Sequence, residues 1–397
     1  MTLLSATNYL QLLDKAWYSQ DAALMANLLS LRDDHTQSVQ LFIDQPRQIV
    51  EYFVTQPLDE LVMVHLKCLY VLSQQKYFEA YKLQIIIVHV VTKIIQSQKD
   101  ENWLLPVMYV VCSDLRLLAQ QANRESIGMG RPGQILERAA ECLMNCFRVC
   151  AADNRSSEED TKRIGMLNLV NQLFKVYFSI NKLHLCKPLI RAIDCSPFKE
   201  MFPLGERITY RYYVGRKAMF DSDYKSADAY LTYAFENCLK SSTHNKRLIL
   251  ISLVPIKMLL GYIPNKHILE KYDLLAFWDV VQAVCQGNLK RFDELMMMHE
   301  LFFINCGIYL IMDKLKILVY RNLFKKLHLI LNTYQIPLES LKDILEFLGQ
   351  GSVSLDETEC IVANLIFEGK IKGYISHQHR KVVVSKKNPF PLLTLLS

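Results

Sequence analysis

The side chains best suited to do chemistry in this sequence are cations near its C-terminal end. Arg321, Lys325 and His328 follow Lys314 at offsets of 7, 11 and 14 residues. At about 100° per residue, these offsets place all four on one narrow stripe of a helix, opposite an apolar stripe. Cations at such spacing favour contact with phosphates or with an acidic partner.

More cations follow downstream. They are Lys370, Lys372, His377, His379, Arg380, Lys381, Lys386 and Lys387. From Lys314 onward there are 12 Lys and Arg against 7 Asp and Glu, a net charge of +5 within a whole-chain charge of +6. We expect this basic module to bind RNA or DNA without sequence specificity. The alternative is a solvated lysine-rich edge, since exposed hairpins are often charged against aggregation.

A second group of basic and aromatic residues lies upstream. The predicted partner-binding residues are Arg207, Tyr210, Arg211, Tyr213, Arg216 and Lys217. Arginine and tyrosine often anchor protein interfaces, so this stretch is a candidate dock for an acidic peptide. The alternative is an ordinary solvated helix face.

No constellation in the sequence supports catalysis. Gly128–Gly133 matches the dinucleotide-binding pattern, but that pattern requires a preceding strand and here a helix is expected. Cys142, Cys146 and Cys150 share one helix face, yet zinc sites use closer cysteine pairs, so we expect small core residues. We therefore predict no enzyme, no metal, no cofactor and no small-molecule substrate.

The elements expected to position the C-terminal cations follow the order of a winged helix. Residues 313–334 predict a first helix, 337–349 a second and 354–369 a third, before a hairpin with its turn at 376–380. Between Asp356 and Glu368 the third helix has no Lys or Arg and carries four carboxylates. A helix that reads base edges must approach phosphates, so this one is not expected to read sequence.

The body before residue 313 predicts helices throughout, with no strand before residue 365. The apolar run within 84–95 resembles a strand, but it lies in an unbroken segment of about 20 residues, a length that favours a helix. Residues 207–239 predict a helical hairpin of the tetratricopeptide kind, with Asp221–Asp223 as its turn. One such hairpin cannot bury its apolar face alone, so neighbouring hairpins are expected to stack into a superhelix.

Composition agrees with long helices in a reducing compartment. The chain has 397 residues, of which only 13 are Gly and 12 are Pro, and it has 11 cysteines. We expect reduced thiols in the nucleus or cytosol. The most apolar window, at 84–95, is too short to cross a bilayer, so no membrane contact is expected.

Four stretches carry a specific resemblance to a known family. They are Glu101–Tyr109, Asn181–Ile193, Tyr212–Asp221 and Gly373–His379. They resemble the PCI proteins, in particular the PCI subunit of the nuclear transcription-and-export complex 2. The resemblance spans essentially the whole chain. It implies a mainly α fold, with a tetratricopeptide-like helical-repeat superhelix followed by a C-terminal winged helix.

The resemblance also implies a domain plan and partners. We expect N-terminal repeats over 1–204, the helical part of a PCI domain over 205–311, its winged-helix part over 312–387 and a tail over 388–397. The implied partners are a large GANP-type scaffold with its own PCI module, a small acidic disordered subunit, and RNA or DNA. The implied role is a non-enzymatic adaptor that couples transcription to mRNA export at the nuclear pore, with a cytoplasmic pool also allowed. The alternative is a purely protein-binding PCI scaffold, as in lid or signalosome complexes.

Overall fold

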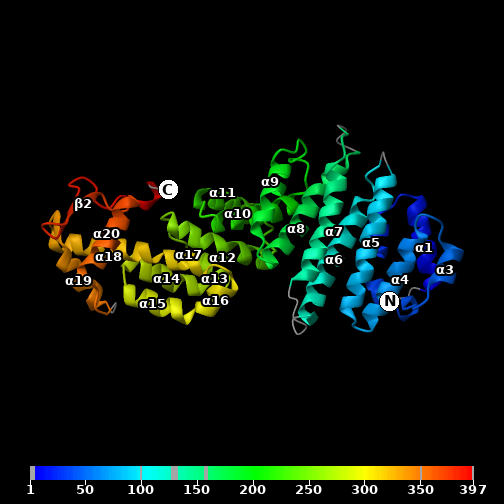
Figure 1. Cartoon of the computed structure of the whole chain (residues 1–397), viewed down its shortest axis with the longest axis horizontal. Helices are drawn as coiled ribbons and strands as arrows, with labels where there is room; N and C mark the ends of the chain where they lie inside the picture. The colour runs from blue at the N-terminus through cyan, green and yellow to red at the C-terminus, as the bar shows by residue number, and fades with distance from the viewer. Residues whose placement is uncertain (1–4, 99–100, 127–132, 156–159, 349–350, 396–397) are drawn as a thin grey trace. The chain divides into compact units, whose positions relative to one another are not determined.

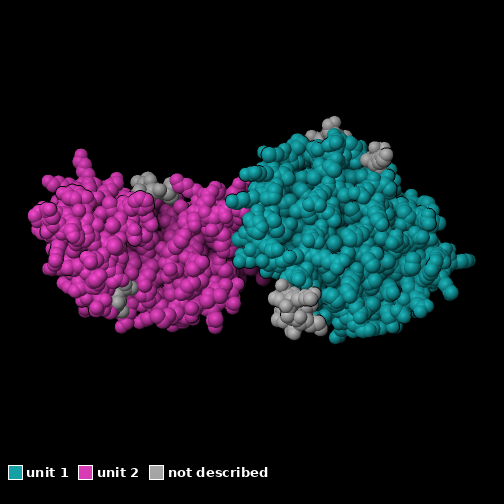
Figure 2. Space-filling model, viewed as in Figure 1, with its two compact units in different colours: residues 1–210 teal, residues 211–397 magenta. Residues whose placement is uncertain are grey.

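The computed structural model describes residues 5–98, 101–126, 133–155, 160–348 and 351–395. The chain divides into two compact units, residues 1–210 and residues 211–397, coloured separately in Figure 2. The glycine-rich stretch matching a dinucleotide loop lies, up to Pro132, outside the described residues. No helix among the described residues is long and apolar enough to cross a membrane.

Every regular element that the structure describes in unit 1 is a helix. Its elements are α1 (Ala6–Tyr18), α2 (Ala22–Leu28), η1 (Asp34–Gln37), η2 (Val39–Leu41), α3 (Arg47–Phe53), α4 (Asp59–Ser73), α5 (Tyr77–Ser97), α6 (Leu105–Ser126), α7 (Gln134–Ala151), η4 (Lys162–Gly165), α8 (Met166–Ser179), η5 (Leu183–Leu185), α9 (Cys186–Asp194) and the start of α10 (Leu204–Phe220). Consecutive helices from α4 to α8 pack on one another, as Figure 1 shows.

The apolar run that resembled a strand lies in the middle of α5, so the helix prediction is confirmed. Ile85, Ile87 and Val91 are buried, because α5 packs against α4, α6 and α7. Cys142, Cys146 and Cys150 on α7 are also buried, as expected of small core residues. Among the described residues no group of three or more His, Cys, Asp or Glu side chains could hold a metal ion.

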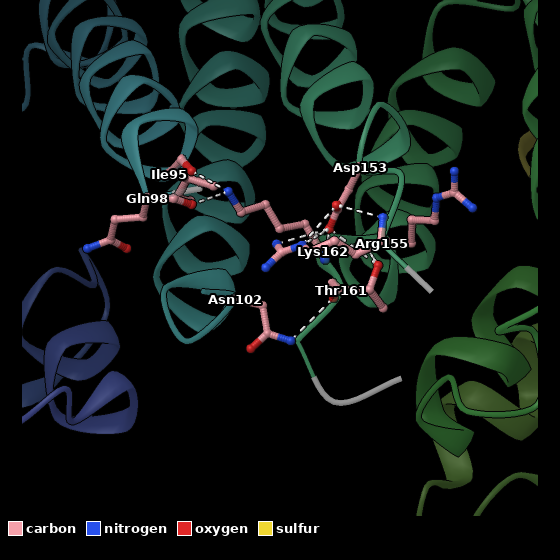
Figure 3. Close-up of polar contacts among 8 residues, drawn as sticks. Ile95, Gln98, Asn102, Asp153, Arg155, Thr161 and Lys162 are labelled. Atoms are coloured by element: carbon pink, nitrogen blue, oxygen red, sulfur yellow. Dashed lines mark hydrogen bonds and ion pairs between the residues drawn. The ribbon is translucent and has the colours of Figure 1, made fainter. Parts of the chain in front are cut away.

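The buried side chain of Lys162 caps the C-terminal end of α5. Lys162 Nζ donates to the carbonyl oxygens of Ile95 at 2.6 Å and Gln98 at 2.5 Å, as Figure 3 shows. The last carbonyls of a helix have no partner inside the helix, and a cation there complements the helix dipole. Asp153 fixes the segment that carries this lysine, because it accepts from the Lys162 amide at 2.7 Å and from Arg155 Nε at 3.0 Å.

Unit 2 continues with helices and ends in a small sheet. Its elements are the rest of α10, α11 (Tyr224–Asn237), α12 (Thr243–Leu259), α13 (Lys266–Lys271), α14 (Leu275–Gln286), α15 (Leu289–Met298), α16 (Glu300–Asn305), α17 (Tyr309–Lys314), α18 (Lys316–Leu331), β1 (Gln335–Pro337), α19 (Leu338–Phe347), α20 (Leu355–Phe367), β2 (Gly373–Ser376), β3 (Lys381–Val384) and η6 (Leu393–Leu395). From α18 onward the order is that of a winged helix, and the predicted fold class is confirmed.

The tetratricopeptide-like hairpin is formed by α10 and α11. A Cβ on Gly215 would lie 2.7 Å from Leu231 Cγ, so only glycine permits this close approach of the two helices. Ser222 takes a left-handed φ of 63° in the turn. The carboxylate of Asp223 then accepts from the Ser226 amide at 3.1 Å and caps α11.

The expectation of no strand before residue 365 is wrong. The three-residue strand β1 pairs antiparallel with β3 in the register Ile336↔Val382, which makes a three-stranded sheet of order β1-β3-β2. Three residues are too few to show alternation in sequence, and Pro337 argued for a helix start. The proline is tolerated because β1 is an edge strand of the sheet.

The predicted first helix of the winged module is two helices. α17 ends at Lys314 and α18 begins at Lys316, with Leu315 buried between them. α18 ends where Asn332 takes a left-handed φ of 47°. Lys314 therefore belongs to a different helix from Arg321 and Lys325, and the 100° arithmetic that grouped them does not apply across the break.

Candidate nucleic-acid interface

Arg321 was predicted to face phosphates, and the structure contradicts this prediction. Only 6% of it is exposed, and its guanidinium donates to the carbonyl oxygens of Pro391 at 2.6 Å and Phe390 at 3.3 Å. Burial lowers the pKa of Arg321 below its usual range. The predicted C-terminal tail covers the helix face that the apolar spacing left open. Arg321 therefore holds the tail and does not face phosphates.

His328 lies under the same tail. Its Nδ1 donates to the Thr333 carbonyl at 2.9 Å, and its ring lies 5.6 Å from that of Phe390. The predicted four-residue stripe is therefore wrong as a phosphate-facing surface. Only Lys325 on α18 is exposed as expected, and it is joined by Lys326, which the spacing argument missed.

The tip of the hairpin carries the exposed cations that the sequence predicted there. His377, His379 and Arg380 are exposed, and Arg380 takes a left-handed φ of 47° in the turn. Lys381 is half-buried at the start of β3. The hairpin lies beside α20 (Figure 1). His377 Nδ1 is 2.9 Å from Glu359 Oε2 of α20, a contact that fixes the tip relative to the third helix.

The base of the hairpin presents a second group of cations. Lys372, Lys386 and Lys387 are exposed, and the register Gly373↔Val384 places Lys372 at the end of the hairpin where Lys386 leaves it. At about 3.3 Å per residue, tip and base lie roughly 10 Å apart along β3. Lys370 differs, because it is paired with Glu368 and its charge is already compensated. We name the exposed cations of hairpin tip and base, from Lys372 to Lys387, the basic wing.

α20 is acidic where a recognition helix is basic. Ser354 Oγ accepts from the Glu357 amide at 3.1 Å and caps the helix. Asp356 and Glu357 in its first turn are exposed. Carboxylates there complement the helix dipole but repel phosphates. This arrangement supports contact through the wing rather than base reading by α20.

An exposed aromatic residue lies between the two groups of cations. Tyr374 of β2 is 63% exposed and is the register partner of Val383. An exposed aromatic ring beside cations is the arrangement on which unpaired bases stack. Within β2, exposed Tyr374 alternates with half-buried Ile375, and this alternation was the signal in the sequence that could have found it.

Two of the predicted partner-binding residues are also corrected. In unit 1, Tyr210 is buried against Phe174, and its hydroxyl donates to Asp194 Oδ1 at 3.0 Å. In unit 2, Lys217 is buried and paired with Asp221. Both are internal because the helix turns these positions toward neighbouring helices. Neither is available to anchor a peptide.

The other predicted partner residues stay partly exposed. In unit 1, Arg207 pairs with Glu200 at 3.2 Å. In unit 2, the Arg211 guanidinium lies 5.0 Å from the centre of the Tyr230 ring, and that of Arg216 lies 5.6 Å from the Tyr212 ring. Tyr213 is half-buried, edge-on to Tyr212. Arginines held on aromatic rings are ordered donors, which lowers the entropy cost of binding a carboxylate.

Helical repeats that end in a winged helix define a PCI-domain scaffold subunit, and the PCI domain model matches residues 293–386. Curated relatives extend the likeness over the whole chain. It is 57% identical to the PCI domain-containing protein 2 homolog of Drosophila melanogaster over 98% of this chain and 99% of the relative. It is 51% identical to PCI domain-containing protein 2 of Xenopus laevis over 99% of both. The chain belongs to the PCI domain-containing protein 2 family.

A more distant relative of the chain has a different name. The chain is 28% identical to the protein CSN12 homolog of Schizosaccharomyces pombe over 96% of both chains. The comparisons therefore identify a PCI scaffold subunit.

Proposed function

We propose that this chain is a non-enzymatic adaptor subunit of a nuclear mRNA-export complex that couples transcription to export at the nuclear pore. In this proposal the basic wing binds RNA or DNA through phosphates, without sequence specificity. The resemblance to the PCI subunit of the transcription-and-export complex 2 supports the export role. The basic wing beside an acidic third helix is the observation that supports nucleic-acid contact.

Exposed aromatic side chains of the winged helix support a protein partner there. Phe347 at the end of α19 is 86% exposed, and Phe367 at the end of α20 is 91% exposed. Large apolar groups left in water commonly mark an interaction site. We propose that this surface meets the large GANP-type scaffold, whose own PCI module would add its winged helix to a shared platform.

The small acidic subunit is the second proposed partner. In unit 2, Arg211 and Arg216 of α10 stay partly exposed and would bind its carboxylates. In unit 1, Arg207 stays partly exposed as a separate candidate contact. The proposed location is the nucleus and the nuclear pore, with a cytoplasmic pool allowed.

The second candidate function is a purely protein-binding PCI scaffold. The likeness to a CSN12 homolog favours it, together with the exposed aromatic residues. In that case the basic wing would meet an acidic protein. Co-purification from nuclear extract separates the two: the export proposal expects a large PCI scaffold and a small acidic chain, and recovery of a lid or signalosome assembly instead would favour the alternative.

Nucleic-acid binding is tested by salt titration of the complex with single-stranded RNA and duplex DNA. Each phosphate contact contributes about 0.7 to the slope of log affinity against log salt for a single strand. Changing Lys372, Lys386 and Lys387 to Glu should shallow that slope by about 2, for every base sequence tested.

The control carries the same change in net charge. Lys67, Lys187 and Lys199 are exposed lysines of unit 1, and changing all three to Glu should leave the slope unchanged. Equal losses in both triple variants would mean that only net charge matters. A slope near zero in the unmodified complex would exclude the platform.

A further inference from the structure

Unit 2 contains a cavity that the proposed nucleic-acid interface does not use. It lies where the end of α10 meets α16 and α17, and its volume is about 430 Å³. Most of its lining is apolar: Met219, Phe220, Ile304, Tyr309, Leu310 and Ile311. Pockets that bind ligands commonly measure about 300–1,000 Å³, so this cavity has room for side chains of a partner.

The polar end of the cavity is built around Lys314. Its Nζ donates to the Tyr224 hydroxyl at 2.9 Å and to Ser222 Oγ at 3.3 Å, and it lies 5.5 Å from the centre of the Tyr224 ring. No carboxylate pairs with Lys314 among the described residues. An ammonium beside two hydroxyl groups is a suitable site for one carboxylate.

The acidic residues on either side of Ser222 in the sequence already have partners within the chain. Asp221 is paired with Lys217, and Asp223 accepts from the Ser226 amide at the start of α11. Asp313, next to Lys314, is exposed. The positive charge of Lys314 is therefore available to a group from outside the chain.

The rim adds a second cation and exposed apolar surface. A Cβ on Gly307 would lie 3.7 Å from the Arg216 guanidinium, so this arginine borders the cavity beside Gly307. Leu310 is 78% exposed at the mouth, and Ile304 is 51% exposed. Apolar side chains left in water at a cavity mouth, next to two cations, match a ligand that is both apolar and negatively charged.

We propose that this cavity docks a short acidic segment of a partner protein, in which an apolar side chain enters the cavity and a neighbouring carboxylate binds Lys314. The sequence alone had placed Lys314 in a phosphate-facing stripe. A nucleic-acid backbone would leave the apolar lining in contact with water. A peptide can bury the lining with an apolar side chain and pair a carboxylate with Lys314. The proposal rests on the acidic partner proposed above for Arg216 and adds an apolar contact to it, and it is independent of nucleic-acid binding by the basic wing.

The test uses the full chain with ¹³C-labelled methyl groups on Met and Ile, because Met219, Ile304 and Ile311 report directly from the cavity. The probe is a synthetic peptide of about 12 residues with Phe and Leu flanked by Asp and Glu. We expect saturable shifts of these three methyl signals with a dissociation constant on the order of 100 μM. A peptide with Lys in place of Asp and Glu, and one with Ser in place of Phe and Leu, should bind at least about tenfold more weakly.

Variants separate the charged and apolar parts of the site. Lys314→Glu should weaken binding of the acidic peptide at least about tenfold, whereas Lys326→Glu, at an exposed lysine of α18, should not. Leu310→Ser should weaken binding severalfold, whereas Leu329→Ser, also at an exposed leucine, should not. All four positions are exposed, so the fold is expected to survive.

Three outcomes would overturn the proposal. One is the absence of saturable shifts up to about 1 mM peptide. Another is equal binding of the Lys-containing peptide. The third is a single-stranded RNA that shifts the same methyl groups and displaces the peptide, which would assign the cavity to nucleic acid. Failure of the basic wing in its own salt titration would leave this result untouched.

Discussion

The guanidinium of Arg321 donates to the carbonyl oxygen of Pro391 at 2.6 Å, across 70 residues of sequence. The contact seats the C-terminal segment on α18. Lys372 adds a backbone bond to the Pro389 carbonyl at 2.8 Å. At Gly261 a Cβ would lie 2.5 Å from Leu393 Cβ, so the segment also needs a glycine beneath it. Residues 389–393 therefore pack on the folded module.

Arg321→Leu should therefore act on stability and not on phosphate binding. Hydrogen bonds from a charged donor contribute about 1.5–3 kcal/mol, and we expect a loss of about 2 kcal/mol in the free energy of unfolding. Urea denaturation measures it. Lys325→Leu, at an exposed position one turn on, should change stability by no more than about 0.5 kcal/mol. A shallower salt slope for Arg321→Leu with unchanged stability would restore the phosphate-facing prediction.

Lys162 should be as important to unit 1 as Arg321 is to unit 2. Lys162→Met keeps the stem but removes both bonds to the Ile95 and Gln98 carbonyls, which then stay buried without this donor. We expect a loss of about 2–4 kcal/mol in the free energy of unfolding. Lys67→Met is the matched control, and its side chain is exposed. Equal stability of the two variants would show that the α5 terminus does not depend on this cation.

Asp153 makes part of the free energy of unfolding depend on pH. Burial acts to raise its pKa. Hydrogen bonds from the Arg155 side chain and from the backbone amides of Lys162 and Arg155 outweigh burial and lower the pKa to about 2. A carboxyl group whose folded pKa is depressed contributes fully above its unfolded pKa of about 4, and that contribution is lost as the pH falls toward 2. The stability difference between the unmodified chain and Asp153→Asn should thus shrink over this range. A constant difference would mean that the charge of Asp153 is irrelevant.

His65 should produce acid sensitivity at a higher pH. It is fully buried against Tyr9, and neither ring nitrogen has a partner among the described residues. Burial, with a smaller effect of His35, lowers its pKa to about 3. Since the folded pKa is below the unfolded value of about 6.5, stability is full above that pH and falls by about 1.4 kcal/mol per pH unit beneath it.

His65→Phe should remove this slope while keeping the stacked geometry. Its stability at pH 7 should be close to that of the unmodified chain, because an unpaired buried polar group is lost. Urea denaturation at several pH values measures both. His184→Phe, at an exposed histidine, should keep the slope. If His65→Phe retained the full slope, the titrating group would lie elsewhere.

The winged helix was largely predictable because its signals are local. Ser354 caps α20 as its spacing indicated, and the β-branched run ending at Val384 forms β3. The interface was only partly predictable. Arg321 and His328 do lie away from the apolar core of α18, but Phe390 and Pro391 cover them from far along the chain. A helical stripe records which side chains share a face, and it carries no information about what packs on that face.

A short-range helix break and a buried side-chain pairing account for two other errors. Leu315 separates α17 from α18, and this one-residue break moves Lys314 into a different environment. Tyr210 was expected to anchor a partner, but a tyrosine can bury its ring when its hydroxyl finds an acceptor, here Asp194. Such pairings depend on how neighbouring helices pack, so the residue type alone could not reveal them.

Tyr374 offers a test that separates stacking from charge on the basic wing. Tyr374→Ala removes an exposed ring and no charge, so the salt slope should stay the same while single-stranded RNA binding weakens by about 1–3 kcal/mol. The affinity for duplex DNA should change little, because its bases are already stacked on one another. Tyr52→Ala, at an exposed tyrosine of α3, is the control and should change neither affinity. Competition binding at several salt concentrations gives the affinity and the salt slope of all three proteins. Equal weakening for RNA and duplex DNA would mean that Tyr374 supports the shape of the hairpin and does not stack on bases.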